Sequence, residues 1–246
     1  MKGFIAAAGR SSRLQDLGEK RNKVLADLGG ETILGNLLGL FEQGGISETF
    51  LTVGFDAPAV RTHVGQRARL VFNPFYEKHG ILSSVWLVRP HLEGQPFLFS
   101  VGDHYLEAAH MQAFLAEQPQ ADILVDVELK TCDDEDMKVF VSRSGGLRTI
   151  TKAWLDGPIL GEFTGLVRCS ADGSRQLFEM LEKHVWQHGP AAMAHGYLAD
   201  VLCTTHRKWE LAFHLSGDHR RVDVDFPCDL ARARDLYGQT HGQNAA

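Results

Sequence analysis

The chain has 246 residues, of which 44% are hydrophobic and 23% charged, and its formal net charge is -6 at pH 7. This balance is typical of a globular protein that buries a full core, and α/β domains of this length often stay undivided, so we expect one domain over residues 1–246. The negative charge, with no stripe of Lys and Arg, makes nucleic acid an unfavourable partner because no counterion release would drive binding.

Two features bear on the compartment. The apolar run Gly3–Ala8 is too short to span a membrane and is expected to form a buried first strand, so no membrane insertion is expected. The cysteines are widely scattered and form no Cys-x-x-Cys pair, which favours reduced thiols in a cytoplasmic protein. They are Cys132, Cys169, Cys203 and Cys228.

The first half of the chain alternates β-rich runs with helical patterns, which is typical of a parallel sheet covered by helices. A helix is expected where Thr32 can cap apolar residues at helical spacing that end before Gly44. Another is expected over Leu106–Glu117. The expected strands are Gly3–Ala8, Thr49–Val53, Arg69–Phe72, Phe97–Val101 and Ile123–Val127.

Beyond Asp133 the pattern changes to shorter pieces that suit an antiparallel insertion, because a turn at Ser144–Gly146 can join two adjacent strands. Together the two halves predict an α/β fold: a mostly parallel mixed sheet flanked by helices, with a small antiparallel insertion. The expected later strands are Lys138–Ser142, Leu147–Lys152, Phe163–Cys169 and Arg221–Val224. The expected later helices are Ser174–His188, a stretch from Pro190 to about Leu202, and Asp229–Tyr237.

The clearest functional signal is Ala6-Ala7-Ala8-Gly9-Arg10-Ser11-Ser12-Arg13-Leu14, followed by Lys23. Small side chains at the end of a buried strand let a flat base approach the backbone, and Gly9 permits a tight turn. Arg13 and Lys23 supply positive charge for a triphosphate. The spacing is neither a dinucleotide fingerprint nor a P-loop. An Ala-rich strand end is by itself more often a packing feature, but the two cations favour a nucleotide site.

Acidic residues stand at two further places. Asp103 directly follows the apolar strand Phe97–Val101, and the carboxyl end of a central strand is where open α/β sheets bind ligands. An isolated Asp there is more often a turn or cap residue. Strand alternation puts Asp223 and Asp225 on one face, so both could reach a cation held by Asp103; Asp223 is the preferred ligand and Asp225 the alternative. Asp229 is expected to cap the final helix.

These motifs resemble those of nucleotidyltransferases whose first loop reads Ala-Ala-Gly-x-x-x-Arg-Leu with a downstream Lys, often preceded by Pro. Asn22 stands here in place of that Pro, and Ser11 where many relatives have Gly. The segment Arg221–Leu230 is similar to the family's closing Asp-x-Asp-x-Pro-x-Asp-Leu pattern, with Phe226 where relatives often have Thr. The resemblance implies a Rossmann-like nucleotidyltransferase fold with a magnesium ion on Asp103 and one of the two later aspartates. It also implies a nucleotide pocket lined by Ala6, Ala8, Gly9, Arg10 and Ser11, with Arg13 and Lys23 on the phosphates.

One stretch resembles cytidylyltransferases for phosphocholine and related headgroups. Asn73–Lys78 followed by Gly80–Trp86 looks like the segment with which those enzymes contact the base. The resemblance implies that Ser83 and Ser84 bind the nucleotide. A buried site that hydrogen-bonds the cytosine amino group would favour CTP over UTP.

Another part of the chain bears on the acceptor. Asp133–Asp136 is similar to the strand entry of inositol-1-phosphate cytidylyltransferase, although clustered like charges are more often a solvated turn. The regions Ile150–Lys152 and Gly161–Gly165 resemble the lining of the acceptor site, which makes Lys152 and Glu162 the candidate acceptor-binding residues. The alternative for these two residues is an exposed ion pair of little energetic value.

The resemblance therefore implies a Mg²⁺-dependent cytidylyltransferase that condenses CTP with a small phosphorylated or phosphonylated alcohol and releases pyrophosphate. The acceptor oxygen would attack the α-phosphorus directly, with Arg13, Lys23 and Lys152 as catalytic cations. A sugar-1-phosphate nucleotidyltransferase is the alternative enzyme, since it would share the first loop and the metal pair. A catalytically inactive nucleotide-binding regulatory subunit is the alternative of another class, and the retained cations and aspartates argue against it. The oligomeric state stays open, a homodimer included.

Overall fold

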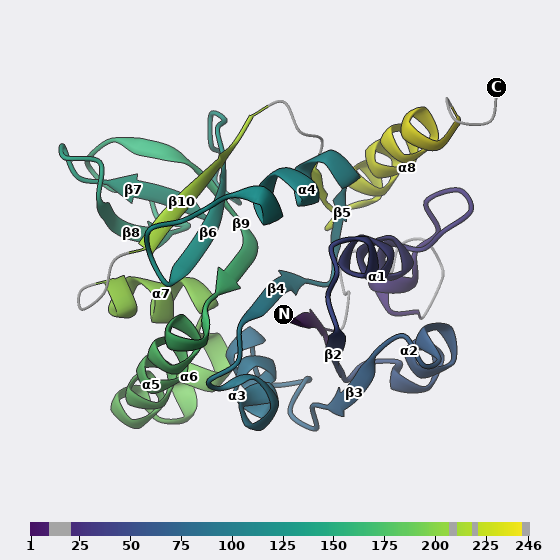
Figure 1. Ribbon diagram of the computed structural model, residues 1–246, viewed down its shortest axis with the longest axis horizontal. Coiled ribbons are helices and arrows are strands. Elements are labelled where there is room, and N and C mark those ends of the chain that lie inside the picture. Colours follow the sequence, from purple (N-terminus) through teal and green to yellow (C-terminus); the bar gives the residue numbers. More distant parts are fainter. Residues whose placement is uncertain (10–20, 207–210, 218–220, 243–246) are drawn as a thin grey trace. The chain divides into compact units, whose positions relative to one another are not determined.

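The computed structural model describes residues 1–9, 21–206, 211–217 and 221–242, and the chain divides into two compact units (Figure 1). Unit 1 comprises Met1–Lys78, Ser100–Ala116 and Asp218–Ala246. Unit 2 comprises His79–Phe99 and Glu117–Gly217. The single domain expected from the sequence stays a prediction beside this division.

Unit 1 is built on parallel strands. β1 (Lys2–Ala7) pairs in parallel with β2 (Glu48–Val53), which pairs in parallel with β3 (Arg69–Phe72). Parallel neighbours need a crossover, and α1 (Ile33–Gln43) and α2 (Ala57–Val64) supply the two that are required here. Nearly every residue of β2 is buried, as expected of a parallel strand covered on both faces.

A second, smaller sheet lies in unit 1. β5 (His104–Leu106) pairs in antiparallel fashion with β11 (Arg221–Asp223). α4 (Ala108–Ala116) follows β5, and α8 (Pro227–Gly242) follows β11. One buried cluster packs β5, β11 and α8 together with α1 and therefore fixes the positions of both strands. Its members are Leu28, Ile33, Tyr105, Val222, Val224, Leu230 and Ala233.

Unit 2 is centred on β6 (Ile123–Glu128), which pairs with β10 (Leu211–Ser216) in parallel and with β9 (Ile159–Cys169) in antiparallel fashion. β4 (Phe97–Val101) starts in this unit, where Phe97–Phe99 pair with β9. The hairpin of β7 (Lys138–Val141) and β8 (Leu147–Thr151) joins β9 through β7. The helices of unit 2 are α3 (Ile81–Leu92), α5 (Ala171–His188), α6 (Pro190–His195) and α7 (Leu198–His206).

The expected fold class is confirmed: an α/β fold with a mostly parallel mixed sheet flanked by helices and a small antiparallel part. Several elements differ from expectation. The segment after Gly80 is the helix α3, which the sequence did not indicate because its internal Pro90 weakens the helical pattern; the base contact expected of this segment stays a prediction. The Pro190 stretch is two helices separated at Gly196. The other described elements that the sequence did not indicate are α2, β5, β10 and the 3₁₀ helix Lys23–Leu25.

Helix starts were placed too late. α5 begins at Ala171, where the hydroxyl of Ser170 caps it by accepting from Gly173 N at 3.0 Å. α8 begins at Pro227 rather than Asp229, because proline is suited to the first helical position, where its missing N–H costs nothing.

Candidate active site

The carboxyl end of β1 is where the sequence placed the nucleotide. Ala8 is buried, Ala6 half-buried and Gly9 exposed. Gly102 N donates to Ala6 O at 2.9 Å, and a Cβ on Gly102 would lie 2.7 Å from that same oxygen. Only glycine therefore allows the chain to pass this close, and the contact brings the residue that follows it, Asp103, beside the end of β1. The predicted nucleotide contacts Arg10, Ser11 and Arg13 lie outside the described residues.

Lys23 lies between two carboxylates. It opens the 3₁₀ helix η2 (Lys23–Leu25), and its Nζ is 2.6 Å from Asp103 Oδ2 and 2.7 Å from Asp225 Oδ1. Burial alone would lower the pKa of Lys23, but the attraction and hydrogen bonds of Asp103 and Asp225 outweigh it and raise the pKa above its usual value. Lys23 is therefore a fixed positive charge at the carboxyl end of β1.

Asn22 fixes the backbone that carries Lys23. Its side-chain amide donates to Ala7 O at 3.0 Å and to Phe55 O at 2.9 Å, and its Oδ1 accepts from Val24 N at 3.3 Å. Its φ of -65° is the angle that a proline ring imposes. Asn22 thus reaches the conformation of the proline it replaces, and it ties η2 to the ends of β1 and β2 as well.

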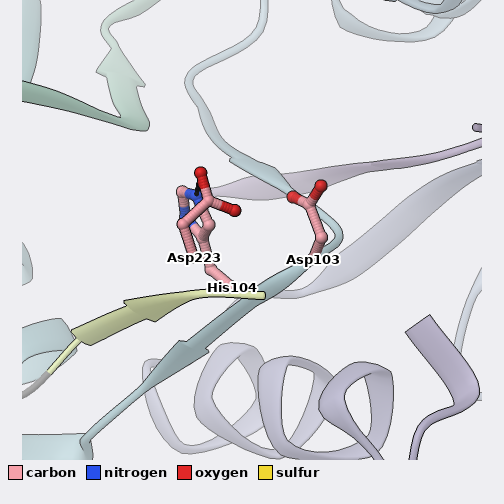
Figure 2. Close-up of side chains that lie close together, drawn as sticks. All are labelled: Asp103, His104 and Asp223. Carbon is pink, nitrogen blue, oxygen red and sulfur yellow. Dashed lines mark ion pairs between the residues drawn. The ribbon is translucent and has the colours of Figure 1, made fainter. Parts of the chain in front are cut away.

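The β5–β11 register brings the acidic residues together. His104 is paired with Asp223 across the two strands, and Val224 N donates to Asp103 O at 3.0 Å. Asp103, His104 and Asp223 each offer a ligand atom, and these atoms all lie within 4.8 Å of one another. Figure 2 shows the three side chains projecting from the neighbouring ends of these elements into one space.

Asp223 is held in its charged form. Burial would raise the pKa of Asp223, but the neighbouring His104, Arg221 and Lys23 outweigh burial and lower it below the usual range of an aspartate. The group fits a divalent cation, because two carboxylates supply oxygen ligands and the buried His104 adds a ring nitrogen whose Nδ1 has no hydrogen-bond partner.

Asp225 has a different environment from Asp223. β11 ends at Asp223, so strand alternation does not extend to Asp225. The carboxylate of Asp225 forms an ion pair with Lys23. Asp229 Oδ2 accepts from the backbone N of Asp225 at 3.2 Å and of Phe226 at 2.7 Å. Asp229 does cap α8, but from inside its first turn, by reaching back to the residues that precede the helix.

The remaining predicted residues lie in unit 2. Ser83 and Ser84 are buried in the first turn of α3, where Ser83 Oγ donates to Gly80 O at 2.8 Å. Lys152 Nζ lies 3.3 Å from Glu135 Oε2. Glu162 Oε2 is 3.3 Å from the Nζ of Lys130. Lys152 and Glu162 are thus each given a partner that the sequence did not indicate.

Lys130 and Lys138 were both missed. Lys130 Nζ lies 3.0 Å from Asp136 Oδ2 as well as 3.3 Å from Glu162. Lys138 is fully buried, and its Nζ donates to Asp136 O at 3.2 Å and to Lys152 O at 2.8 Å. The only sequence signal was their position on either side of the acidic segment. His104 was also missed as a possible ligand, because its position beside Asp223 depends on the register of β5 against β11.

The comparisons with known proteins identify a family and a fold. The family described as the MobA-like NTP transferase domain matches residues 3–158. A curated relative, the CMP-5'-(3-aminopropyl)phosphonate synthase of Streptomyces rubellomurinus, is 33% identical over 126 residues, which are 49% of this chain and 20% of the relative. The match therefore spans about a fifth of that relative's length.

Solved structures resemble the whole chain in fold. A protein of Bacillus anthracis proposed to be a glucose-1-phosphate thymidylyltransferase gives a TM-score of 0.78 at 16% identity, covering 96% of this chain and 94% of its own. The CTP:phosphocholine cytidylyltransferase of Streptococcus pneumoniae gives 0.76 at 16%, covering 96% and 98%. The inositol-1-phosphate CTP transferase of T. maritima gives 0.76 at 18%, covering 96% and 94%. Among the helices described, none is long and apolar enough for a membrane span.

Proposed function

The chain belongs to the MobA-like NTP transferase family, and from that premise we propose that it is a Mg²⁺-dependent cytidylyltransferase acting on CTP and a small phosphorylated or phosphonylated acceptor. The observation that carries the proposal is the Lys23 site, which we define as Lys23, Asp103, His104, Asp223 and Asp225. It lies at the carboxyl end of β1, beside the Ala8-Gly9 loop that the sequence assigns to the nucleotide.

The charge of the Lys23 site supports a metal requirement. Its three carboxylates outnumber the single ammonium group of Lys23, so a triphosphate would be repelled from the site as it stands. A divalent cation on Asp103 and Asp223 would remove that repulsion and stabilise charge on the α-phosphate and the leaving pyrophosphate. Lys23, held by Asp103 and Asp225, would stand ready to contact the phosphates without further reorganisation.

The acceptor side is assigned to unit 2. The attacking phosphate or phosphonate oxygen is already anionic, so the protein has to position it and offset its charge rather than remove a proton. We assign that task to Lys152, with Glu162 as a second acceptor contact. Lys130 forms an ion pair with Glu162, and Glu135 forms one with Lys152, so both partners would influence how strongly this region attracts an anionic acceptor.

The identity of the substrates is supported by the relatives. The name of the curated relative indicates cytidylyl transfer to an aminoalkylphosphonate, and two of the structural neighbours are named as cytidylyltransferases for phosphocholine and inositol phosphate. A sugar-1-phosphate nucleotidyltransferase is the second candidate, because one structural neighbour is named for that activity. We further propose that the protein is cytoplasmic, and a homodimer is compatible with the proposal.

The test is pyrophosphate release with CTP, UTP, GTP and ATP, each combined with 3-aminopropylphosphonate, phosphocholine, inositol 1-phosphate and glucose 1-phosphate. We expect turnover with CTP and one of the first three acceptors, and none when Mg²⁺ is chelated. Faster turnover with UTP or another triphosphate on glucose 1-phosphate would establish the sugar alternative. CTP binding without turnover on any acceptor would favour an inactive nucleotide-binding subunit.

A further inference from the structure

His104 is a buried imidazole with one ring nitrogen left without a hydrogen-bond partner. The residue is 3% exposed, its Nδ1 has no hydrogen-bond partner, and its Nε2 is 3.7 Å from Asp223 Oδ2. That separation suits an ion pair but is longer than a hydrogen bond. Most buried polar groups in folded proteins are hydrogen-bonded, so an imidazole buried in this way needs an explanation.

The backbone aims His104 at the carboxylates. β5 and β11 place it in register with Asp223, and the bond from Val224 N to Asp103 O joins the residue before it to the same strand end. The next residue, Tyr105, points to the opposite face and is fully buried in the cluster beneath. The backbone of His104 is therefore held in place before any cation arrives, which lowers the cost of using the residue as a ligand.

We propose that His104 is a third protein ligand of the divalent cation, with Asp103 and Asp223, and that its nitrogen raises the affinity of the site for Mn²⁺ relative to Mg²⁺. The proposal rests on the metal site of the proposed function. Carboxylates bind both ions, whereas imidazole suits the transition metals better than it suits magnesium. A site of two carboxylates and one imidazole should therefore accept Mn²⁺ more readily than a site of two carboxylates alone.

The competing role for His104 is electrostatic. In that case the ring would only attract Asp223 and would never contact the metal. The two roles differ in whether a nitrogen is bonded to the cation and in whether the choice of metal depends on the side chain at position 104. Both consequences can be measured without turnover.

The experiment is pulsed electron paramagnetic resonance of Mn²⁺ bound to the full chain together with inorganic pyrophosphate, a probe that contains no nitrogen. We expect modulation from a directly bound ¹⁴N nucleus, replaced by the ¹⁵N pattern when the chain is labelled with [¹⁵N]histidine. The labelled wild-type chain needs no substitution, so the result does not depend on how a variant folds. His104→Gln should abolish the modulation, and His63→Gln, which changes an exposed histidine of unit 1, should leave it intact.

Calorimetric titration measures the selectivity of the site for Mn²⁺ over Mg²⁺. His104→Gln should weaken Mn²⁺ binding about tenfold or more and Mg²⁺ binding by a smaller factor, so the ratio of the two dissociation constants changes. One result would overturn this inference and leave the proposed function standing. In that result Asp103→Asn weakens Mn²⁺ binding, but the wild-type chain shows no nitrogen modulation and His104→Gln leaves the ratio of the Mn²⁺ and Mg²⁺ dissociation constants unchanged. Mn²⁺ binding that is undetectable, or that Asp103→Asn leaves unaltered, would overturn both.

Discussion

Each unit of the molecule holds a lysine between two carboxylates, and the two arrangements differ in what surrounds them. In unit 1, Lys23 lies 2.6 Å from Asp103 and 2.7 Å from Asp225. In unit 2, Lys130 lies 3.0 Å from Asp136 and 3.3 Å from Glu162. In both, burial would lower the pKa of the lysine and the carboxylates raise it. The lysine motif alone therefore does not distinguish a catalytic site from an ion-pair network.

The difference lies in burial and in the charge left over. The side chain of Lys23 is 14% exposed and that of Lys130 is 35% exposed, so water screens Lys130 more strongly. Lys23 also has a further carboxylate nearby, on Asp223, together with the ring of His104. These features fit the proposed role of the Lys23 site in holding a divalent cation, whereas the group formed by Lys130, Asp136 and Glu162 is a partly exposed ion-pair network.

The largest expected effect is on the metal ligands. Asp103→Asn and Asp223→Asn should each reduce kcat about 100- to 1,000-fold, because transition-state charge on the phosphates would lose its stabilisation. Asp225→Asn should cost less, since the carboxylate of Asp225 is paired with Lys23 and Asp223 is the preferred metal ligand. Steady-state kinetics at saturating Mg²⁺ measure all three. An active Asp223→Asn beside an inactive Asp225→Asn would exchange the roles of the two residues.

The comparison of the two lysines comes next. Lys23→Gln should lower kcat/KM for CTP about 100-fold, because the loss of a preorganised cation near the phosphates is felt in the transition state. Lys130→Gln should change the same constant less than about fivefold, as expected for a partly exposed ion pair. Similar losses of kcat/KM for CTP in both variants would remove the distinction between the two units.

Asn22 offers a test of how the Lys23 site is held. Asn22→Ala should cost about 1–3 kcal/mol of unfolding free energy, because it removes the partners of buried backbone groups. It should also lower kcat, since η2 loses its anchor to Ala7 and Phe55. Asn22→Pro keeps φ near -65° and should retain more activity than Asn22→Ala. Thermal denaturation and kcat are the measurements; equal activity of the two variants would show that the backbone angle at this position is unimportant.

The smallest expected effect is on the acceptor. Lys152→Ala should raise the KM of the acceptor several-fold, because it removes one electrostatic interaction that solvent partly screens. The affinity for CTP in the absence of acceptor should not change. Glu135→Gln, which removes the partner of Lys152, is the matched control and should not raise this KM. If Lys152→Ala loses affinity for CTP while the acceptor kinetics stay normal, Lys152 contacts the nucleotide and the proposed acceptor contact is wrong.

The fold could be predicted from the sequence where a local pattern, such as a β-rich run or a helix-capping residue, was clear. β3 has the bounds that its β-rich run indicated, and the hydroxyl of Thr32 caps α1 as expected, accepting from Gly35 N. β10 was missed because its short apolar run is interrupted by His214, which is buried in the strand that pairs with β6. A pattern cannot report burial that tertiary pairing creates.

Four of the five residues of the Lys23 site were proposed from the sequence, but the way in which they are grouped could not be predicted. Asp103, Asp223 and Asp225 were all identified, and strand alternation suggested that the last two share a face. The structure ends β11 at Asp223 and turns the chain, so that Asp225 contacts Lys23 and Asp223 faces His104. The different partners of Asp223 and Asp225 depend on the register of β5 against β11 and on the close approach of the chain at Gly102. Neither feature can be predicted from local sequence.

The central claim is that the divalent cation binds in unit 1 on Asp103 and Asp223. Anomalous diffraction from a crystal of the protein with Mn²⁺ and CTP tests it most directly. The account predicts a Mn²⁺ peak about 2.2 Å from a carboxylate oxygen of each of these residues, with the α-phosphate bound to the same ion. A single peak on the acidic segment Asp133–Asp136 of unit 2, with none on Asp103 and Asp223, would contradict it.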